Sequence, residues 1–156
     1  MGTDIHMLGE YKHWMTNVWT PFTLPEELQG RNYAFFAHLA DVRNGFGFAG
    51  VYRHEPVKPL TSDRGFPEDM SEFARAWATE QDMGLAEKLL PYGPGDHSAG
   101  YATLRELEGH DWEQGADATT IATQLITFLM YWQPPDHLIG YDNPKDYVRI
   151  LFSFDS

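Results

Sequence analysis

The sequence of 156 residues contains no cysteine. Such a chain has no disulfide framework, no thiolate nucleophile and no Cys-based zinc site, so histidine and carboxylate side chains are its only strong metal ligands. Basic residues are scarce as well, at 11 against 23 acidic residues, and the formal net charge is −12. This charge repels a phosphate backbone, which argues against binding of bulk nucleic acid.

Long hydrophobic runs are also missing. No apolar stretch approaches the roughly 18–20 residues that a membrane-spanning helix needs, and residues 1–6 lack the basic and apolar regions of a signal peptide. We therefore expect a cytoplasmic protein without a membrane partner. Its 42% hydrophobic and 15% aromatic residues are too many for a disordered chain, and its length predicts a single domain over residues 1–156.

Alternating polarity predicts a strand near each end of the chain. In residues 3–8, Ile5 and Met7 fall on one face and Asp4 and His6 on the other, and residues 147–154 alternate in the same way. We expect the two strands to pair, because each needs a partner for its backbone groups. A further short strand is expected around residues 14–20.

Helical spacing, capping signals and proline positions predict helices between these strands. The expected helices cover residues 31–41, 67–80, 103–109 and 117–132, with a short addition at 85–90. The glycine and proline residues within 43–66 predict an ordered loop region instead. The whole pattern predicts an α+β fold, in which a small, mostly antiparallel sheet including both termini packs with about four helices and a long ordered loop region.

Two polar groups could hold a divalent metal ion. Asp4 and His6 lie two apart on the predicted strand and so point the same way, and Asp96, His97 and Ser98 follow a glycine-rich turn. If the two segments meet, their carboxylates and imidazoles form a four-ligand set. In the alternative interpretation, the strand residues bind neighbouring backbone and Asp96 caps a turn.

A local excess of basic charge suggests a phosphate site. Residues 31–64 hold five basic and three acidic residues, whereas the rest of the chain holds six basic and twenty acidic ones. The same segment is rich in tyrosine and phenylalanine, and guanidinium groups with flat rings suit a nucleotide. The candidate ligand contacts are Arg31, Asn32, Tyr33, Arg43, Asn44, Phe46, Phe48, Tyr52, Arg53, Arg64 and Ser98. Alternatively, the aromatic rings belong to the core and the arginines pair with the surplus acids.

Two other patterns indicate structure more than chemistry. Residues 45–50 match G-x-G-x-x-G, but a predicted helix precedes them and a proline-rich loop follows, which is the wrong context for a dinucleotide site. Its glycines still suit a loop whose backbone approaches a ligand closely. His38 and His110 lie on or beside predicted helices, where we expect structural roles.

The sequence resembles a family of small proteins encoded by bacteriophages and prophages, whose chains typically open M-G-C-D-I-H. The resemblance extends over nearly the whole chain and rests on residues 1–6, 31–33, 36–37, 39–45, 58–60, 64–67, 96–98, 103–107 and 152–156. This chain departs at Thr3, where the family usually has cysteine. The resemblance implies a phage origin but no particular reaction. Small phage proteins of this kind often act against host defences that signal through cyclic or ADP-ribose-type nucleotides.

These observations favour a phage-encoded protein that sequesters a small anionic nucleotide-type ligand in the host cytoplasm. Because such proteins often form their pockets between subunits, a homo-oligomer is also expected. One alternative is a metal-dependent phosphodiesterase or nucleotide hydrolase, in which Asp4, His6, Asp96 and His97 hold a divalent ion that generates hydroxide. Another is a protein that binds and blocks a host protein through its acidic, aromatic-rich surface.

Overall fold

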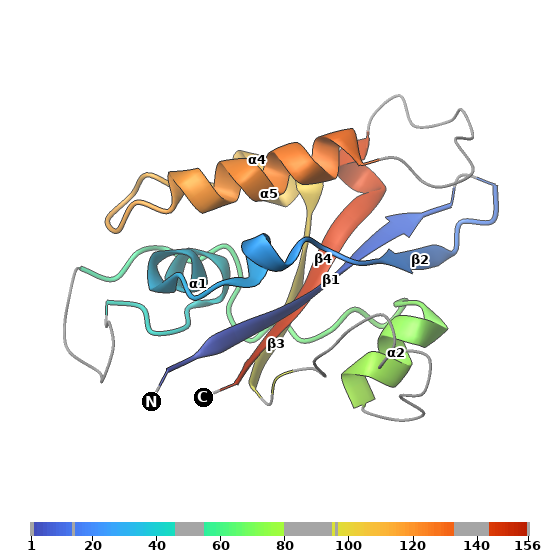
Figure 1. The fold of residues 1–156 in the computed structure, drawn as a ribbon, viewed down its shortest axis with the longest axis horizontal. Helices are drawn as coiled ribbons and strands as arrows, with labels where there is room; N and C mark the ends of the chain where they lie inside the picture. The colour runs from blue at the N-terminus through green and yellow to red at the C-terminus, as the bar shows by residue number, and fades with distance from the viewer. Residues whose placement is uncertain are drawn as a thin grey trace.

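The computed structural model describes residues 2–13, 15–45, 55–79, 95, 97–132 and 144–155. Its centre is a four-stranded antiparallel sheet in the order β2-β1-β4-β3 (Figure 1). The strands are β1 Asp4–Lys12, β2 Trp19–Phe22, β3 His97–Thr103 and β4 Val148–Asp155. The α-helices in the described residues are α1 Tyr33–Ala40, α2 Glu72–Thr79, α4 Leu104–Gly109 and α5 Thr119–Tyr131, and two short 3₁₀ helices are η1 Glu26–Gln29 and η3 Pro144–Asp146. The predicted α+β class is confirmed.

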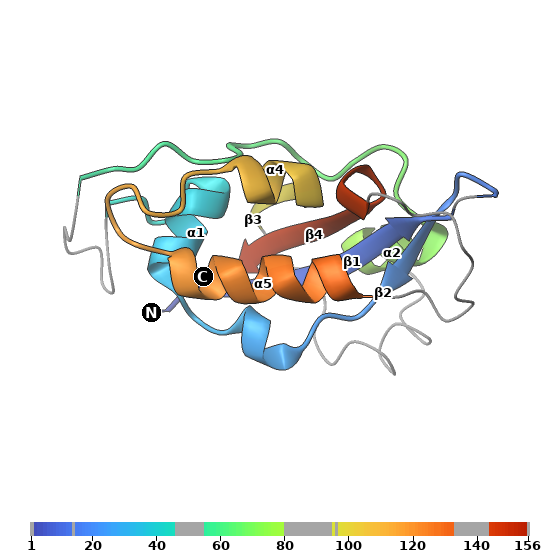
Figure 2. The same ribbon diagram turned by 90° about the horizontal axis from the view of Figure 1, so that it is seen from above.

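Helices cover both faces of the sheet. Helices α1, α4 and α5 lie over one face, as Figure 2 shows from above, and α2 lies on the other. Alternate residues of β1 and β4 supply the larger core under the three helices, among them Ile5, Phe152 and Phe154. Leu8 and Leu151, on the opposite face, pack against Trp77 of α2. The alternation predicted at both ends of the chain is therefore confirmed, as is the pairing of the two strands.

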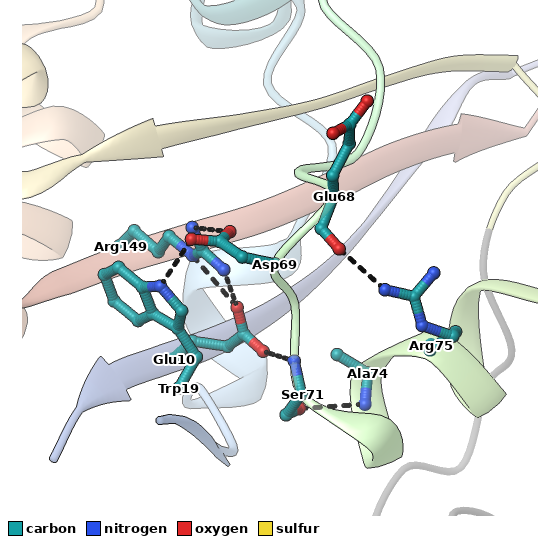
Figure 3. Close-up of polar contacts among 8 residues, drawn as sticks. All are labelled: Glu10, Trp19, Glu68, Asp69, Ser71, Ala74, Arg75 and Arg149. Atoms are coloured by element: carbon teal, nitrogen blue, oxygen red, sulfur yellow. Dashed lines mark hydrogen bonds and ion pairs between the residues drawn. The ribbon is translucent and has the colours of Figure 1, made fainter. Parts of the chain in front are cut away.

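A buried ion pair joins α2 to the sheet. Arg149 of β4 donates from Nε and Nη2 to Glu10 Oε1 at 2.9 and 2.7 Å, and its guanidinium lies 3.7 Å from the centroid of the Trp19 ring (Figure 3). The other oxygen of Glu10 accepts from the backbone nitrogen of Ser71. Arg149 also donates to Asp69. Arg149 thus connects β1, β2 and the segment that precedes α2.

Helix α2 begins later than the sequence predicts. The expected start was Pro67, followed by two acids, whereas the helix begins at Glu72. Asp69 instead accepts from Arg149 and from Trp19 Nε1, which holds it outside the helix. Ser71 Oγ accepts from the backbone nitrogen of Ala74, as a helix-capping side chain does.

Strand β3 was not expected, because residues 97–103 carry mostly small side chains with low strand propensity. The neighbouring strand explains both its formation and its composition. A Cβ on Gly100 would lie 2.7 Å from the Phe152 ring, so the absence of a side chain makes room for that ring. The other edge strand, β2, lies at Trp19–Phe22, later than the 14–20 predicted. The predicted helices at 103–109 and 117–132 are confirmed as α4 and α5, and Thr103 and Glu106 form the expected capping box.

Candidate anion-binding site

Polar residues from distant parts of the chain meet where β1 begins and β4 ends. The two strands are antiparallel, so the chain ends lie side by side (Figure 1). Asp4 is the register partner of Asp155, and His6 is that of Ser153. We call this group the terminal cluster. Its members are Thr3, Asp4, His6, Arg31, Tyr33, Arg43, Ser153 and Asp155.

Arg31 makes a bidentate ion pair with Asp4. Its Nε and Nη2 donate to the two carboxylate oxygens at 2.7 and 3.2 Å. The hydrogen bond to Arg31 lowers the pKa of Asp4 below its ordinary value, and the pairing raises the pKa of Arg31. Gly2 makes room for this arrangement, since a Cβ there would lie 2.3 Å from the Arg31 guanidinium. Both side chains are about half exposed, at 54% for Arg31 and 46% for Asp4.

Thr3, Arg43 and Tyr33 form the inner part of the terminal cluster. Arg43 Nε donates to the hydroxyl of the buried Thr3 at 2.7 Å, and the Arg43 guanidinium lies 4.9 Å from the centroid of the Tyr33 ring. The backbone nitrogen of Thr3 donates to Tyr33 Oη. Arg43 reaches the first turn of α1 because the chain turns sharply after the helix, with left-handed backbone at Asp41 and Arg43, φ 62° and 51°. A guanidinium is therefore held against a flat ring beside the sheet.

His6 completes the terminal cluster on the β4 side. Its Nε2 lies 2.6 Å from Asp155 Oδ2. The neighbouring Ser153 hydroxyl accepts from the backbone nitrogen of Gly95 at 2.7 Å. Gly95 lies so close to β4 that a Cβ would be 2.2 Å from the Phe154 backbone, so only glycine fits there. Gly95, which precedes β3, therefore contacts Ser153, the register partner of His6.

His97 and Ser98 do not join His6. His97 is the register partner of Phe154 and its ring stacks on that phenylalanine, with centroids 6.1 Å apart. Since successive residues of a strand point to opposite faces, the partners of Ser153 and Phe154 lie on opposite sides of the sheet. Ser98 Oγ lies 2.9 Å from His97 Nδ1, at an irregularity in β3. The described part of the chain contains no group of three or more His, Asp or Glu residues placed to hold a metal ion.

Three other predicted ligand residues have structural partners. Asn32 caps α1 by accepting from the backbone nitrogen of Phe35. Asn44 binds Asp41 and both backbone groups of Val57, which ties the two ends of the segment 45–56 together. Arg64 pairs with Glu106 and donates to the carbonyl of Tyr101, which is a backbone acceptor on the edge strand β3. The three residues thus have structural roles, and their assignment as ligand contacts stays a prediction.

The remaining predicted site residues lie outside the described residues. They are Phe46, Phe48, Tyr52, Arg53 and Asp96. The helix predicted at residues 85–90 also lies outside them. Thr3, Ser153 and Asp155 belong to the terminal cluster but were not predicted from the sequence. A signal was present for the last two, because both fall on the polar face of the strand that was predicted to pair with Asp4 and His6.

A pair of imidazoles, the buried His38 and the half-buried His110, lies elsewhere, between α1 and the turn after α4. His38 Nε2 lies 2.7 Å from the carbonyl oxygen of Ala116, so this nitrogen must donate, and Nδ1 of a neutral His38 then accepts from His110 Nε2 at 3.0 Å. Burial lowers the pKa of His110, and the adjacent His38 lowers it further, against an opposing effect of Asp111. The expected structural role of both histidines is consistent with this geometry.

This pair predicts a loss of stability in acid. The pKa of His110 in the folded protein is below its ordinary value of 6.5, so the unfolded chain binds the proton first as the pH falls. The favourable contribution of the neutral His110 to the free energy of unfolding is therefore complete above about pH 6.5 and is lost as the pH falls below that value. We expect the free energy of unfolding, measured in urea, to fall between about pH 7.5 and about pH 5.5. His110→Gln should reduce that fall relative to the parent protein. An equal fall in the variant and the parent would show that His110 is not responsible.

None of the helices in the described residues is both long enough and apolar enough to cross a membrane. Comparison of the chain with protein-family models, with curated proteins and with solved structures found no match.

Proposed function

We propose that the protein binds a small anionic, nucleotide-type ligand at the terminal cluster. The observation that carries this proposal is that Arg31 and Arg43 bind the neighbouring residues Asp4 and Thr3 where β1 begins. Tyr33 lies against Arg43, and His6 follows Asp4 two residues further along the strand. Arg31, Tyr33, Arg43 and His6 come from three separate segments of the chain. Two arginines, a tyrosine ring and an imidazole supply the phosphate-binding and stacking groups that a nucleotide requires.

The Arg31–Asp4 pair supports ligand exchange. Both side chains are about half exposed, and ion pairs of that kind contribute little to folding stability. A phosphate carries more charge than a carboxylate and matches the same planar donor geometry. Arg31 can therefore leave Asp4 for a ligand phosphate at low cost.

Arg43 supports a different part of the same function. Its guanidinium is already held by Thr3 and by the Tyr33 ring, so little side-chain entropy is lost when a ligand binds. Guanidinium groups and aromatic rings are also the surfaces on which nucleobases stack. Arg43 and Tyr33 thus form a rigid platform beside the exchangeable Arg31.

Sequestration is better supported than hydrolysis. In the metal-dependent alternative Asp4 and His6 are metal ligands, but Asp4 pairs with Arg31 and His6 with Asp155. His97, the third of these ligands, lies on the other face of the sheet from His6. The biological form of the proposal, a phage protein that removes a host signalling nucleotide, draws on the sequence resemblance.

The proposal is tested by incubating the protein with a panel of cyclic dinucleotides and cyclic ADP-ribose isomers and then heating it to release bound ligand. We expect one ligand to be depleted from solution and recovered intact. Recovery of a cleaved ligand only when divalent metal is present would favour the hydrolase. Depletion of no ligand would contradict the proposal and leave the alternative of a protein that blocks a host protein.

Arg31→Ala should weaken binding of the depleted nucleotide by about ten-fold to a hundred-fold, because a charge-assisted phosphate contact is lost. Arg105→Ala is a matched control, since Arg105 makes the same bidentate pair with Asp146, at 2.7 and 2.9 Å, and is exposed to a similar extent. That variant should bind as the parent does. Isothermal titration calorimetry measures both affinities, and equal affinities for the two variants would remove Arg31 from the site.

A further inference from the structure

Two half-exposed carboxylates lie within the terminal cluster. Asp4 begins β1, Asp155 ends β4, and their side chains are 46% and 45% exposed. Arg31 binds Asp4. His6 binds Asp155. Because a carboxylate repels a phosphate, both acids oppose the binding of an anion unless the ligand also carries hydrogen-bond donors.

The Asp4 carboxylate accepts from two donors at once. Arg31 Nε and Nη2 approach different oxygens of this carboxylate, at 2.7 and 3.2 Å. The two N–H groups are nearly parallel and lie in one plane, as in every bidentate pair of a guanidinium with a carboxylate. An ionised carboxylate accepts hydrogen bonds and donates none. A ligand group that replaces Arg31 at Asp4 must therefore offer two adjacent donors in one plane.

Among the common nucleobases, guanine alone carries such a pair of donors on one edge. Its N1–H and its N2 amino group point the same way, whereas adenine and cytosine set one amino group beside a ring nitrogen that accepts hydrogen bonds. Uracil and thymine have a single N–H between two carbonyl oxygens. Each of these four bases would place an acceptor against one oxygen of Asp4, and that contact is repulsive.

The space in front of Asp4 suits a flat group. The Arg31 guanidinium lies so close to Gly2 that a Cβ there would be 2.3 Å from Cζ and from Nη1. Any side chain at this position would fill the place that the planar guanidinium occupies. The neighbouring residue Thr3 donates from its backbone nitrogen to Tyr33 Oη, so the Tyr33 ring ends one residue away from Asp4. A planar ring that replaces the guanidinium would thus lie near the platform of Arg43 and Tyr33.

We propose that Asp4 selects a guanine nucleotide, by accepting from N1–H and from the N2 amino group of the base. This inference rests on the proposed function and names the base of its ligand. When Arg31 moves to the phosphate, guanine takes its place, so Asp4 exchanges one bidentate contact for another. Asp155 keeps its contact with His6. Neither carboxylate is then left unpaired beside the bound anion.

Ligands that share their phosphate groups and differ in the base test this assignment. Suitable pairs are cyclic di-GMP with cyclic di-AMP, and GDP with ADP. In each pair that binds, we expect the guanine ligand to bind about ten-fold to a hundred-fold more tightly, because adenine cannot satisfy Asp4. The inosine counterparts lack the N2 amino group and should have intermediate affinities. Isothermal titration calorimetry measures all of these affinities.

The outcomes separate this inference from the proposed function. Equal affinities for guanine and adenine ligands would overturn the assignment of guanine and leave nucleotide binding intact. Depletion of a cyclic ADP-ribose isomer alone would do the same, because its base is adenine. If no nucleotide binds, both proposals are contradicted.

Asp4→Asn distinguishes recognition of the base from support of Arg31. The amide of asparagine offers one acceptor and one donor, which match the N1–H and C2 carbonyl of xanthine but not the two donors of guanine. We expect the variant to lose about ten-fold or more in affinity for the guanine ligand and to prefer the xanthine counterpart, while its affinity for the adenine ligand does not fall.

Asp146→Asn is the matched control, since Asp146 makes the same bidentate pair with Arg105 and is exposed to a similar extent. This variant should keep the preference of the parent for guanine. If Asp4→Asn weakens guanine and adenine ligands equally, Asp4 acts only by positioning Arg31, and the proposal is overturned.

Discussion

Replacement of Arg149 by methionine is expected to lower the free energy of unfolding by about 3–5 kcal/mol, the usual effect of removing one partner of a buried ion pair. Arg149 and Glu10 are both buried, with side chains 4% and 0% exposed. Without the guanidinium, the Glu10 carboxylate would remain buried, and within the described residues the Ser71 backbone nitrogen would be its one remaining donor (Figure 3). Urea unfolding followed by tryptophan fluorescence measures the change.

Two further variants separate this cause from a general effect of the substitution. Arg75→Met removes an exposed arginine of α2 that donates to the carbonyl of Glu68, and the change should stay within about 0.5 kcal/mol. The double variant Glu10→Leu, Arg149→Met removes both charges and should recover most of the lost stability. If the double variant is less stable than Arg149→Met, an unpaired Glu10 is not the cause.

Removal of residues 147–156 is expected to abolish folding altogether. These residues include β4, which pairs with both β1 and β3 and supplies Ile150, Phe152 and Phe154 to the core. Without β4, β3 loses the strand that it pairs with and β1 is left with one unpaired edge. Unpaired strand edges promote aggregation. The truncated chain should be insoluble, or lack the far-ultraviolet circular dichroism of the parent.

A circular permutant controls for the loss of sequence. Placing residues 147–156 before residue 2 through a short glycine linker turns β4 and β1 into a hairpin, because Asp155 and Asp4 are already register partners. This protein should fold and show the circular dichroism of the parent. A truncated chain that is soluble and has the circular dichroism of the parent would show that the fold does not require β4.

The parts of the fold predicted from sequence are those whose own residues carry a periodic or capping signal. Strands β1 and β4 alternate clearly, α4 carries its capping box at Thr103, and the apolar stripe of α5 is continuous. The start of α2 and the existence of β3 depend on other segments. Arg149 holds Asp69 away from the helix, and β3 consists of small residues that fit under Phe152. Such tertiary causes leave no local pattern.

The candidate site shows the same division. The sequence singled out Arg31, Tyr33 and Arg43 as phosphate and stacking groups, and the structure brings them together. Asn32 and Arg64 were singled out on the same chemistry, yet they bind backbone groups. The residue types that suit a ligand contact are the same as those that bind backbone groups within the protein. Only the neighbours that the fold provides distinguish them.

The position of β4 has a consequence for the order of events during synthesis. Of the four described strands, β4, one of the two inner strands, is made last by the ribosome, after β1, β2 and β3. Until residues 148–155 have emerged, β1 and β3 have no common neighbour, and the contact of Asp4 with Asp155 spans nearly the whole chain. Contacts between residues so far apart in sequence form slowly, since a long loop must close first. The complete sheet and the terminal cluster therefore form only after β4 has left the ribosome, and until then the edges of β1 and β3 that β4 will cover remain exposed.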